Sequence, residues 1–257
     1  MDTESIFDKY ELDWADEFDY EGAPDPAKWD FEVGNHQWYN NELQAYTDRP
    51  SNVFVKDGSL HIVARKEKDG EREYTSARMI SYGRRSFTKG LFEIRCKLPK
   101  GLGSWPAIWL LGSSIKEGTP WPRCGEIDVV EHAGRWQDEL FFSLHTNRHN
   151  HTRKDTVQYS TIKKVAGVSE DFHDYLLEWT DDYMEFYVDG VSCCRYNKAD
   201  DKEDQSAESW PFDEPHFLIC NVAVGGTMGG DVDESAMPFE MQVEHIRYYR
   251  PKETGNR

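Results

Sequence analysis

The 257-residue sequence lacks the features that would indicate a membrane protein or a nucleic-acid-binding protein. It has no run of about 18 apolar residues, the length a helix needs to cross a bilayer. Its first residues, Met1–Ser5, carry neither a basic patch nor an apolar stretch, so we expect no signal peptide. Positive charge is scarce, because 30 Lys and Arg stand against 48 Asp and Glu, a net charge of −18. Such a surface repels phosphate backbones and anionic lipids, and is compatible with a neutral polymer as partner.

Cysteine is sparse and irregularly spaced. An odd number of cysteines with no C-x-x-C pair predicts neither a disulfide framework nor a zinc site, and leaves a single bridge open. The sequence also lacks internal repeats, low-complexity linkers and any long segment with a helical period. A length of 257 residues is common for one all-β sandwich or barrel, so we predict a single domain over 1–257. The five cysteines are Cys96, Cys124, Cys193, Cys194 and Cys220.

Short segments of alternating or continuous apolar residues, separated by turns, predict an all-β fold. Residues 91–98 alternate apolar and charged side chains, the period of a half-buried strand. An Asp-Gly turn at Asp57 joins two strand-like segments in a hairpin. Residues 217–224 form a buried strand, and 241–249 alternate again. Many short strands with frequent turns predict an antiparallel sandwich.

Two polar segments indicate surface loops. The acidic stretch 198–208 is expected to be a solvated loop, because like charges repel and hydrate well. The sequence Asn150-His151-Thr152 matches the glycosylation sequon, a short pattern that often occurs by chance.

The segment 124–132 is the strongest candidate for chemistry. Side chains alternate faces along a strand, so Glu126 and Asp128 share one face while Glu131 faces the other way. One extra residue, a β-bulge, would return Glu131 to the acidic face. Three carboxylates on one face of an apolar strand repel each other and lose hydration, which raises the pKa of at least one.

An acid and a carboxylate of unequal pKa are what glycoside hydrolysis requires. We assign Glu126 as nucleophile, Glu131 as acid/base and Asp128 as the group that tunes Glu126. Retention requires carboxyl groups about 5–5.5 Å apart, so the two Glu side chains must lean together over a curved sheet. Two other interpretations of the pattern stay open: a solvated acidic face on an edge strand, and a calcium site.

The segment 126–131 resembles the E-x-D-x-x-E signature of glycoside hydrolase family 16, in the bulged form of its laminarinases and agarases. The resemblance runs from about Leu12 to Tyr249 and is closest to bacterial endo-1,3-β-glucanases. It implies a concanavalin-like β-jelly roll of two curved antiparallel sheets with a concave substrate cleft. It also implies endo-acting, retaining hydrolysis of laminarin-type β-1,3-glucan, with mixed-linkage glucan as a further substrate. The other matching blocks are 40–47, 76–79, 103–111, 121–122, 144–146 and 221–226.

Six further residues match sugar-binding positions of the family. Three are tryptophans, whose faces stack on pyranose rings, and Trp105 and Trp109 are spaced to share a strand face. The resemblance places Asn41 and Arg78 in the glycone subsites and His145 beside the substrate or the acid/base. Core packing for Trp105 and Trp109, a salt bridge for Arg78 and a structural role for His145 stay open. The six are Asn41, Arg78, Trp105, Trp109, Trp121 and His145.

The resemblance implies no cofactor for catalysis but a structural calcium ion on the convex side. Its ligands would be Glu17, the Gly58 carbonyl and Glu244, although the family more often has Asp at the last position. Two departures predict a remodelled cleft. Tyr39 stands where Gly is frequent, and the segment 227–230 lacks a Trp that many members have.

Other activities on the same fold also remain open: a lichenase, an agarase, a transglycosylase, or a non-catalytic glucan-binding lectin. The complete set of three acids favours an enzyme, because a lectin has no need of both Glu126 and Glu131. The resemblance further implies an extracellular protein, although no leader is recognised and a cytoplasmic location therefore stays open. An open cleft needs no partner subunit, so we expect a monomer.

Overall fold

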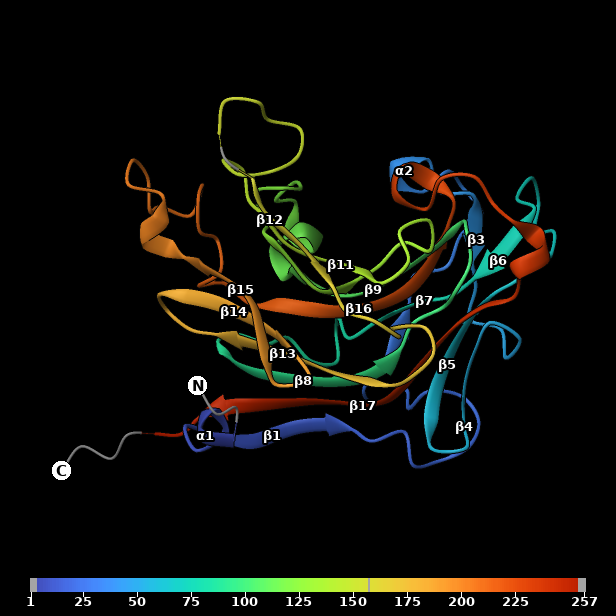
Figure 1. The fold of residues 1–257 in the computed structure, drawn as a ribbon, viewed down its shortest axis with the longest axis horizontal. Helices are drawn as coiled ribbons and strands as arrows, with labels where there is room; N and C mark the ends of the chain where they lie inside the picture. The colour runs from blue at the N-terminus through green and yellow to red at the C-terminus, as the bar shows by residue number, and fades with distance from the viewer. Residues whose placement is uncertain (1–3, 157, 254–257) are drawn as a thin grey trace.

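The computed structural model describes residues 4–156 and 158–253, which form two packed antiparallel sheets (Figure 1). The first sheet runs in the order β12 (Tyr159–Lys164), β11 (Glu139–His145), β10 (Glu126–Glu131), β9 (Ser104–Gly112), β16 (His216–Val224), β7 (Arg78–Ile80) and β2 (Asp30–Phe31). The second runs in the order β15 (Val191–Asn197), β14 (Tyr183–Val188), β13 (His173–Trp179), β8 (Gly90–Lys97), β17 (Phe239–Pro251), β5 (Ser59–Ala64) and β4 (Val53–Lys56), with β1 (Tyr10–Asp16) paired to β17. The predicted antiparallel sandwich is confirmed.

The remaining elements are short. A parallel pair, β3 (Gln44–Tyr46) and β6 (Tyr74–Ser76), lies apart from the two sheets. The α-helices are α1 (Glu4–Phe7) and α2 (Gly226–Gly229), and the 3₁₀ turns are η1 (Tyr39–Asn41), η2 (Ser113–Glu117), η3 (Lys198–Asp200) and η4 (Glu234–Ala236). None of the helices among the described residues is long and apolar enough to span a membrane.

The main core lies between the two sheets. On β8 the alternating residues Phe92, Ile94 and Cys96 are fully buried, as the period of two predicts. They belong to one apolar cluster with Ile127 and Val129 of β10. The inward face of β10 is therefore fixed by packing, and its acidic residues must lie on the outer face of the first sheet.

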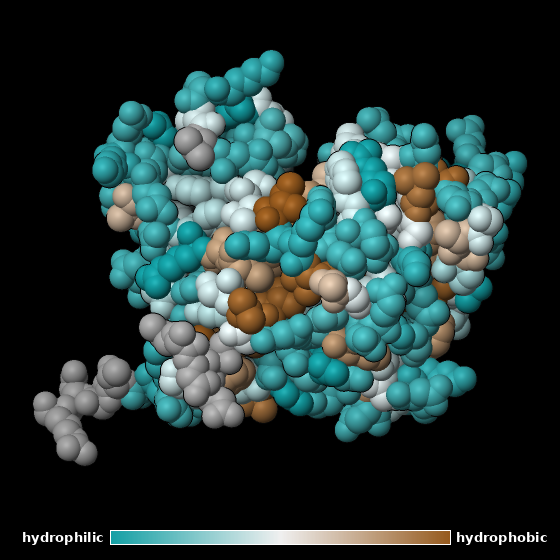
Figure 2. Space-filling model, viewed as in Figure 1, coloured by the Kyte–Doolittle hydropathy of each residue, from teal (hydrophilic) through white to brown (hydrophobic). Residues whose placement is uncertain are grey.

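That outer face forms the floor of a hollow. Figure 2 shows a notch between two raised walls at the top of the view. In Figure 1 the segment 146–156, which follows β11, rises on one side, and α2 and η1 lie on the other. Gly226 of α2 needs its glycine, because a Cβ there would lie 2.8 Å from the Asn40 carbonyl oxygen and 3.3 Å from the Trp105 ring. This is the wall in which the sequence departs from the family.

The structure answers three smaller questions that the sequence raised. All five cysteines are free thiols, so the bridge left open is not formed. The side chain of Asn150 is buried and donates a hydrogen bond to the Thr146 carbonyl 3.0 Å away, which makes it a poor glycosylation acceptor. The expectation that 198–208 is a solvated loop is wrong for Asp201, which is only 8% exposed.

Candidate active site

The register of β10 against β9 brings the three acids to one face. Glu126 pairs with Leu111 and Asp128 with Trp109, but Val130 then pairs with Ile108, so Val129 is one extra residue. Glu131 consequently pairs with Ala107, which shares its face of β9 with the partners of the other two acids. The predicted β-bulge is therefore confirmed.

Glu126 and Glu131 each accept a hydrogen bond from a different tryptophan. The Trp121 indole N–H donates to Glu126 Oε2 at 3.0 Å, and the Trp105 indole N–H donates to Glu131 Oε1 at 3.0 Å. Trp121 lies in the loop before β10, whereas Trp105 projects from the neighbouring strand β9. The two carboxylates are thus oriented separately, by donors that come from different segments.

His145 of β11 supplies the positive charge of the site. Its Nε2 lies 3.3 Å from Asp128 Oδ2 and 3.6 Å from Glu126 Oε1. Burial alone would lower the pKa of this imidazole, but its hydrogen bond to Asp128 and the charge of Glu126 raise that pKa to about 9. A cation therefore lies between Asp128 and Glu126 at neutral pH.

The environment raises the pKa of both glutamates, and the same two causes act on each. Burial is the larger cause and the charge of Asp128 is the second, for Glu126 and for Glu131. The opposing contributions differ, because His145 and then Trp121 lower the pKa of Glu126, whereas Trp105 is the main group that lowers that of Glu131. Glu126 beside the imidazolium and Glu131, whose pKa is raised further, form the acid and base pair that glycoside chemistry requires.

The same cluster also has the spacing of a cation site. The ligand atoms of Glu126, Asp128 and His145 lie within 4.8 Å of one another, which is close enough for a shared cation. The structure instead has the His145 imidazolium beside Asp128 and Glu126, and a metal ion would have to displace its proton, because a metal ligand must be a neutral imidazole.

Comparison with known proteins agrees with this geometry. The family model described as glycosyl hydrolases family 16 matches residues 40–246. The chain belongs to family 16 of the glycosyl hydrolases. It is 45% identical over 246 residues to a beta-glucanase of Rhodothermus marinus, covering 94% of this chain and 85% of that protein.

Two solved structures of similar proteins extend the likeness to the fold of this family 16 hydrolase. The laminarinase of Rhodothermus marinus superposes with a TM-score of 0.90 at 45% identity, covering 95% of this chain and 98% of that one. SCLam, a non-specific endo-beta-1,3(4)-glucanase of the family, superposes with a TM-score of 0.87 at 38% identity, covering 95% and 92%. The jelly roll and the enzyme class expected from the sequence are confirmed.

Beyond the acids, four sugar-binding candidates of the family 16 enzyme lie on or beside the same sheet face. Arg78 of β7 pairs with Asn221 of β16, which pairs in turn with Ala107, so this row leads across the sheet to Glu131. The Arg78 guanidinium stacks 4.9 Å from the centre of the Trp109 ring, and Trp109 donates to Asn221 Oδ1 at 2.8 Å. Trp105 and Trp121 complete the set at the two acids.

The structure shows some of the other roles that the sequence left open for these residues. Arg78 does form a salt bridge, with its Nε 2.6 Å from Glu32 Oε2, and Trp105 is 8% exposed. Asn41 lies in η1, on the wall of the hollow opposite the segment 146–156, and has a left-handed φ of 59°. Tyr39, in the same turn, is 79% exposed. Sugar binding by the six residues stays a prediction. Sequence reasoning missed Glu32, because its distance of 46 positions from Arg78 leaves no local signal.

The residues expected to hold calcium are engaged elsewhere. Both carboxylate oxygens of Glu17 accept hydrogen bonds from Arg247 at 2.8 Å, and this arginine lowers the pKa of Glu17. Glu244 Oε2 accepts from Arg95 at 2.6 Å, while Gly58 lies in the turn between β4 and β5. Since guanidinium groups neutralise both carboxylates, this arrangement does not fit a calcium ion.

Proposed function

We propose that this family 16 enzyme is an endo-acting, retaining β-1,3-glucanase that uses Glu126 as nucleophile and Glu131 as acid/base. The observation that carries the assignment is the bulge in β10, which puts both glutamates on one open face with separate tryptophan donors. The His145 cation lies 3.6 Å from Glu126 and favours its ionised form, whereas the pKa of Glu131 is raised further, to about 8 against about 7 for Glu126, so Glu131 stays protonated more readily.

The proposed reaction has two steps. Glu131 protonates the glycosidic oxygen while the Glu126 carboxylate attacks the anomeric carbon, which releases one half of the chain and leaves a glycosyl ester. Glu131, now ionised, removes a proton from water, which displaces Glu126 and restores both groups. Asp128 holds the His145 cation beside the nucleophile throughout. No cofactor is needed, because the two carboxylates and the attacking water supply every proton and electron pair.

A neutral β-glucan is the proposed substrate. The two similar structures are named a laminarinase and a non-specific endo-beta-1,3(4)-glucanase. The net charge of −18 disfavours sulfated or acidic polymers, which would be repelled from the cleft. Mixed-linkage 1,3-1,4-β-glucan is therefore the second substrate that we propose.

Release of reducing ends from laminarin tests this proposal, with lichenan and agarose in parallel. We expect rapid release of mixed oligosaccharides from laminarin, slower release from lichenan and none from agarose. Cleavage of agarose alone would contradict the substrate, and binding of laminarin without cleavage of any polymer would contradict the enzyme.

The two tryptophan donors predict shifts of different limbs of the pH profile of kcat/KM. Trp121→Phe removes the N–H that lowers the pKa of Glu126, so that pKa rises and the acidic limb moves to higher pH by roughly one unit. Trp105→Phe raises the pKa of Glu131 by the same argument, so the alkaline limb moves to higher pH. Each variant is the control of the other, and a shift of the same limb in both would contradict the assigned roles.

For the calcium ion implied by the family resemblance, we propose that the fold is stable without it. Arg247 and Arg95 already neutralise Glu17 and Glu244, so a calcium ion would have to displace two ion pairs. The melting temperature should therefore be the same in excess calcium and in EDTA. A rise in melting temperature with calcium concentration would show a binding site that this arrangement does not provide.

We further propose that the enzyme acts as a monomer outside the cell. The proposed site is built from one chain, and the resemblance to laminarinases supports an extracellular polymer as substrate. Light scattering after size-exclusion chromatography checks the first point, with a mass near 30.0 kDa expected.

A further inference from the structure

The segment 146–156 carries a histidine into the cleft beside the nucleophile. The His151 ring lies 5.3 Å from the Trp121 ring and 5.4 Å from the His145 ring, between centroids. Trp121 donates to Glu126 and His145 lies 3.6 Å from it, so His151 contacts two residues that touch the group that we propose as nucleophile. The side chain is exposed, and no hydrogen bond from a described residue reaches its ring nitrogens. Its polar edge is thus available to a ligand.

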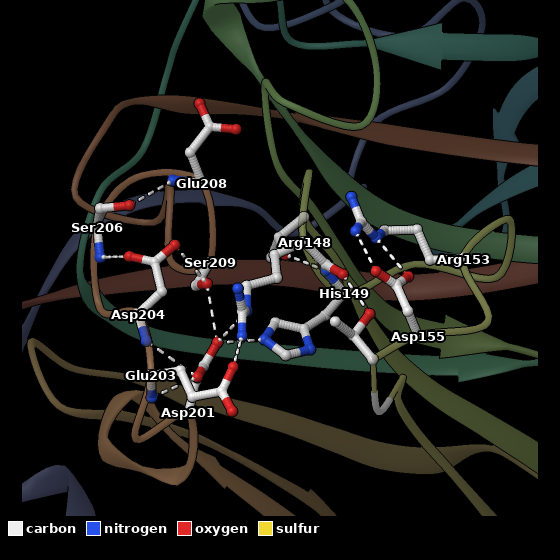
Figure 3. A network of polar contacts seen from close by, with 12 residues as sticks. Arg148, His149, Arg153, Asp155, Asp201, Glu203, Asp204, Ser206, Glu208 and Ser209 are labelled. Carbon is white, nitrogen blue, oxygen red and sulfur yellow. Dashed lines mark hydrogen bonds and ion pairs between the residues drawn. The ribbon is translucent and has the colours of Figure 1, made fainter.

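A buried carboxylate holds this segment in place (Figure 3). Asp201 Oδ2 lies 2.8 Å from His149 Nε2 and accepts from the Ser209 hydroxyl at 3.0 Å. Its other oxygen accepts from the backbone N–H groups of Glu203 and Asp204, at 2.9 and 3.1 Å. Asp201 therefore ties the acidic loop 198–209 to the segment that carries His151.

A second connection reaches the segment of Trp121. Glu208 pairs with Arg123, two residues after Trp121, at 2.8 Å, and it accepts a hydrogen bond from the Asn147 amide. The Arg148 backbone N–H also donates to the Glu208 carbonyl at 2.9 Å. The acidic loop thus contacts both the segment that contains Trp121 and the segment that contains His151.

Hydrogen bonds inside the segment hold the backbone on both sides of His151. Asn150 donates to the Thr146 carbonyl and accepts from the Thr152 backbone N–H at 3.0 Å. His151 lies between these two anchored neighbours, so its backbone is held in place, and its ring contacts the rings of Trp121 and His145. A side chain held in this way loses little entropy when it binds.

The chemistry of His151 suits a sugar hydroxyl. Partial loss of hydration in the cleft, and then the charge of His145, lower its pKa, which favours the neutral ring, while Asp128 opposes this more weakly. A neutral imidazole has one donor and one acceptor nitrogen, which match a hydroxyl group. A flat Trp121 ring lies beside it for the apolar face of a pyranose.

The position of His151 decides which sugar it would contact. Arg78 lies on the β16 side of the acids, and the family resemblance assigns that residue to the glycone subsites. The segment 146–156 follows β11, on the other side of β10. We propose that His151 hydrogen-bonds a hydroxyl of the glucosyl unit on the leaving-group side, and that Asp201 is the positioning residue for its segment. This inference rests on the proposed β-glucanase function.

Two substrates separate this role from a general effect on the site. A laminari-oligosaccharide places glucose on both sides of the cleaved bond, whereas an aryl β-laminaribioside places no sugar on the leaving-group side. His151→Ala should lower kcat/KM for the oligosaccharide about five- to tenfold, the value of one neutral hydrogen bond. It should change kcat/KM for the aryl glycoside by less than about twofold. Lys154→Ala, an exposed change in the same segment, is the matched control.

Asp201→Asn tests the positioning role with the same two substrates. We expect a selective loss on the oligosaccharide, and a normal ratio for Glu203→Gln, which removes an exposed carboxylate of the same loop. Equal losses on both substrates, or no loss for His151→Ala, would overturn the inference. A selective loss for His151→Ala but not for Asp201→Asn would overturn the positioning role. If the unaltered enzyme cleaves neither substrate, the proposed function itself fails.

Discussion

Glu126→Gln should reduce the kcat on laminarin by at least about a thousandfold, because an amide cannot form the glycosyl ester. The substitution keeps the shape of the side chain, and its carbonyl oxygen can still accept from Trp121. Initial rates of reducing-end release measure the loss. Glu203→Gln is the control, since it removes a carboxylate that is 82% exposed. Activity within tenfold of the unaltered enzyme would contradict the nucleophile assignment.

The same variant should not be less stable. Burial and the charge of Asp128 raise the pKa of Glu126 in the folded state, so the folded protein binds more protons than the unfolded chain above the ordinary carboxyl pKa. Stability therefore falls as the pH rises from the unfolded pKa of Glu126 to the folded one. A glutamine avoids that loss, so the variant should melt at a higher temperature at mildly alkaline pH. Below the ordinary carboxyl pKa of about 4, the two proteins should melt together.

Glu131→Ala should lower kcat/KM on laminarin by about 10²–10⁴-fold, the usual contribution of a general acid. The loss should be much smaller for an aryl glycoside, because a phenolate leaves without a proton. The second step then lacks its base, and added azide should restore turnover because it attacks the glycosyl ester without deprotonation. The product should be a β-glycosyl azide, which NMR identifies.

The matched comparison for this prediction is Glu126→Ala with the same aryl glycoside and azide. It has no carboxylate to form the ester, so azide can give only the α product. An equal loss on laminarin and the aryl glycoside for Glu131→Ala, with no effect of azide, would contradict its role as acid/base.

Much of the fold follows from local sequence patterns. The period of two along β8 and the turn at Asp57 determine strand and hairpin because side-chain direction is set residue by residue. The bulge at Val129 was predictable for a chemical reason: without it, Glu131 would point into the apolar core. These inferences needed only neighbouring residues.

The remaining contacts of the site and of the acidic loop join segments that are far apart in the sequence. No local pattern indicates that Trp105, 26 residues from Glu131, donates to it, or that Asp201 lies 52 residues from its partner His149. The acidic loop is the clearest case, because a run of like charges predicts solvation unless a partner outside the run buries one of them. His149 and Ser209 do this for Asp201. The arginines that pair with Glu17 and Glu244 are likewise far away in the sequence, at 230 and 149 positions.

The configuration of the first product tests the central claim most directly, since the claim is that Glu126 and Glu131 act by double displacement. Proton NMR of laminarin hydrolysis, recorded within the first minutes, observes the anomeric proton of the new reducing end before mutarotation. Two displacements at one carbon predict the β anomer first, followed by slow appearance of the α anomer. Initial release of the α anomer would mean a single displacement by water, and would contradict the role of Glu126 as nucleophile.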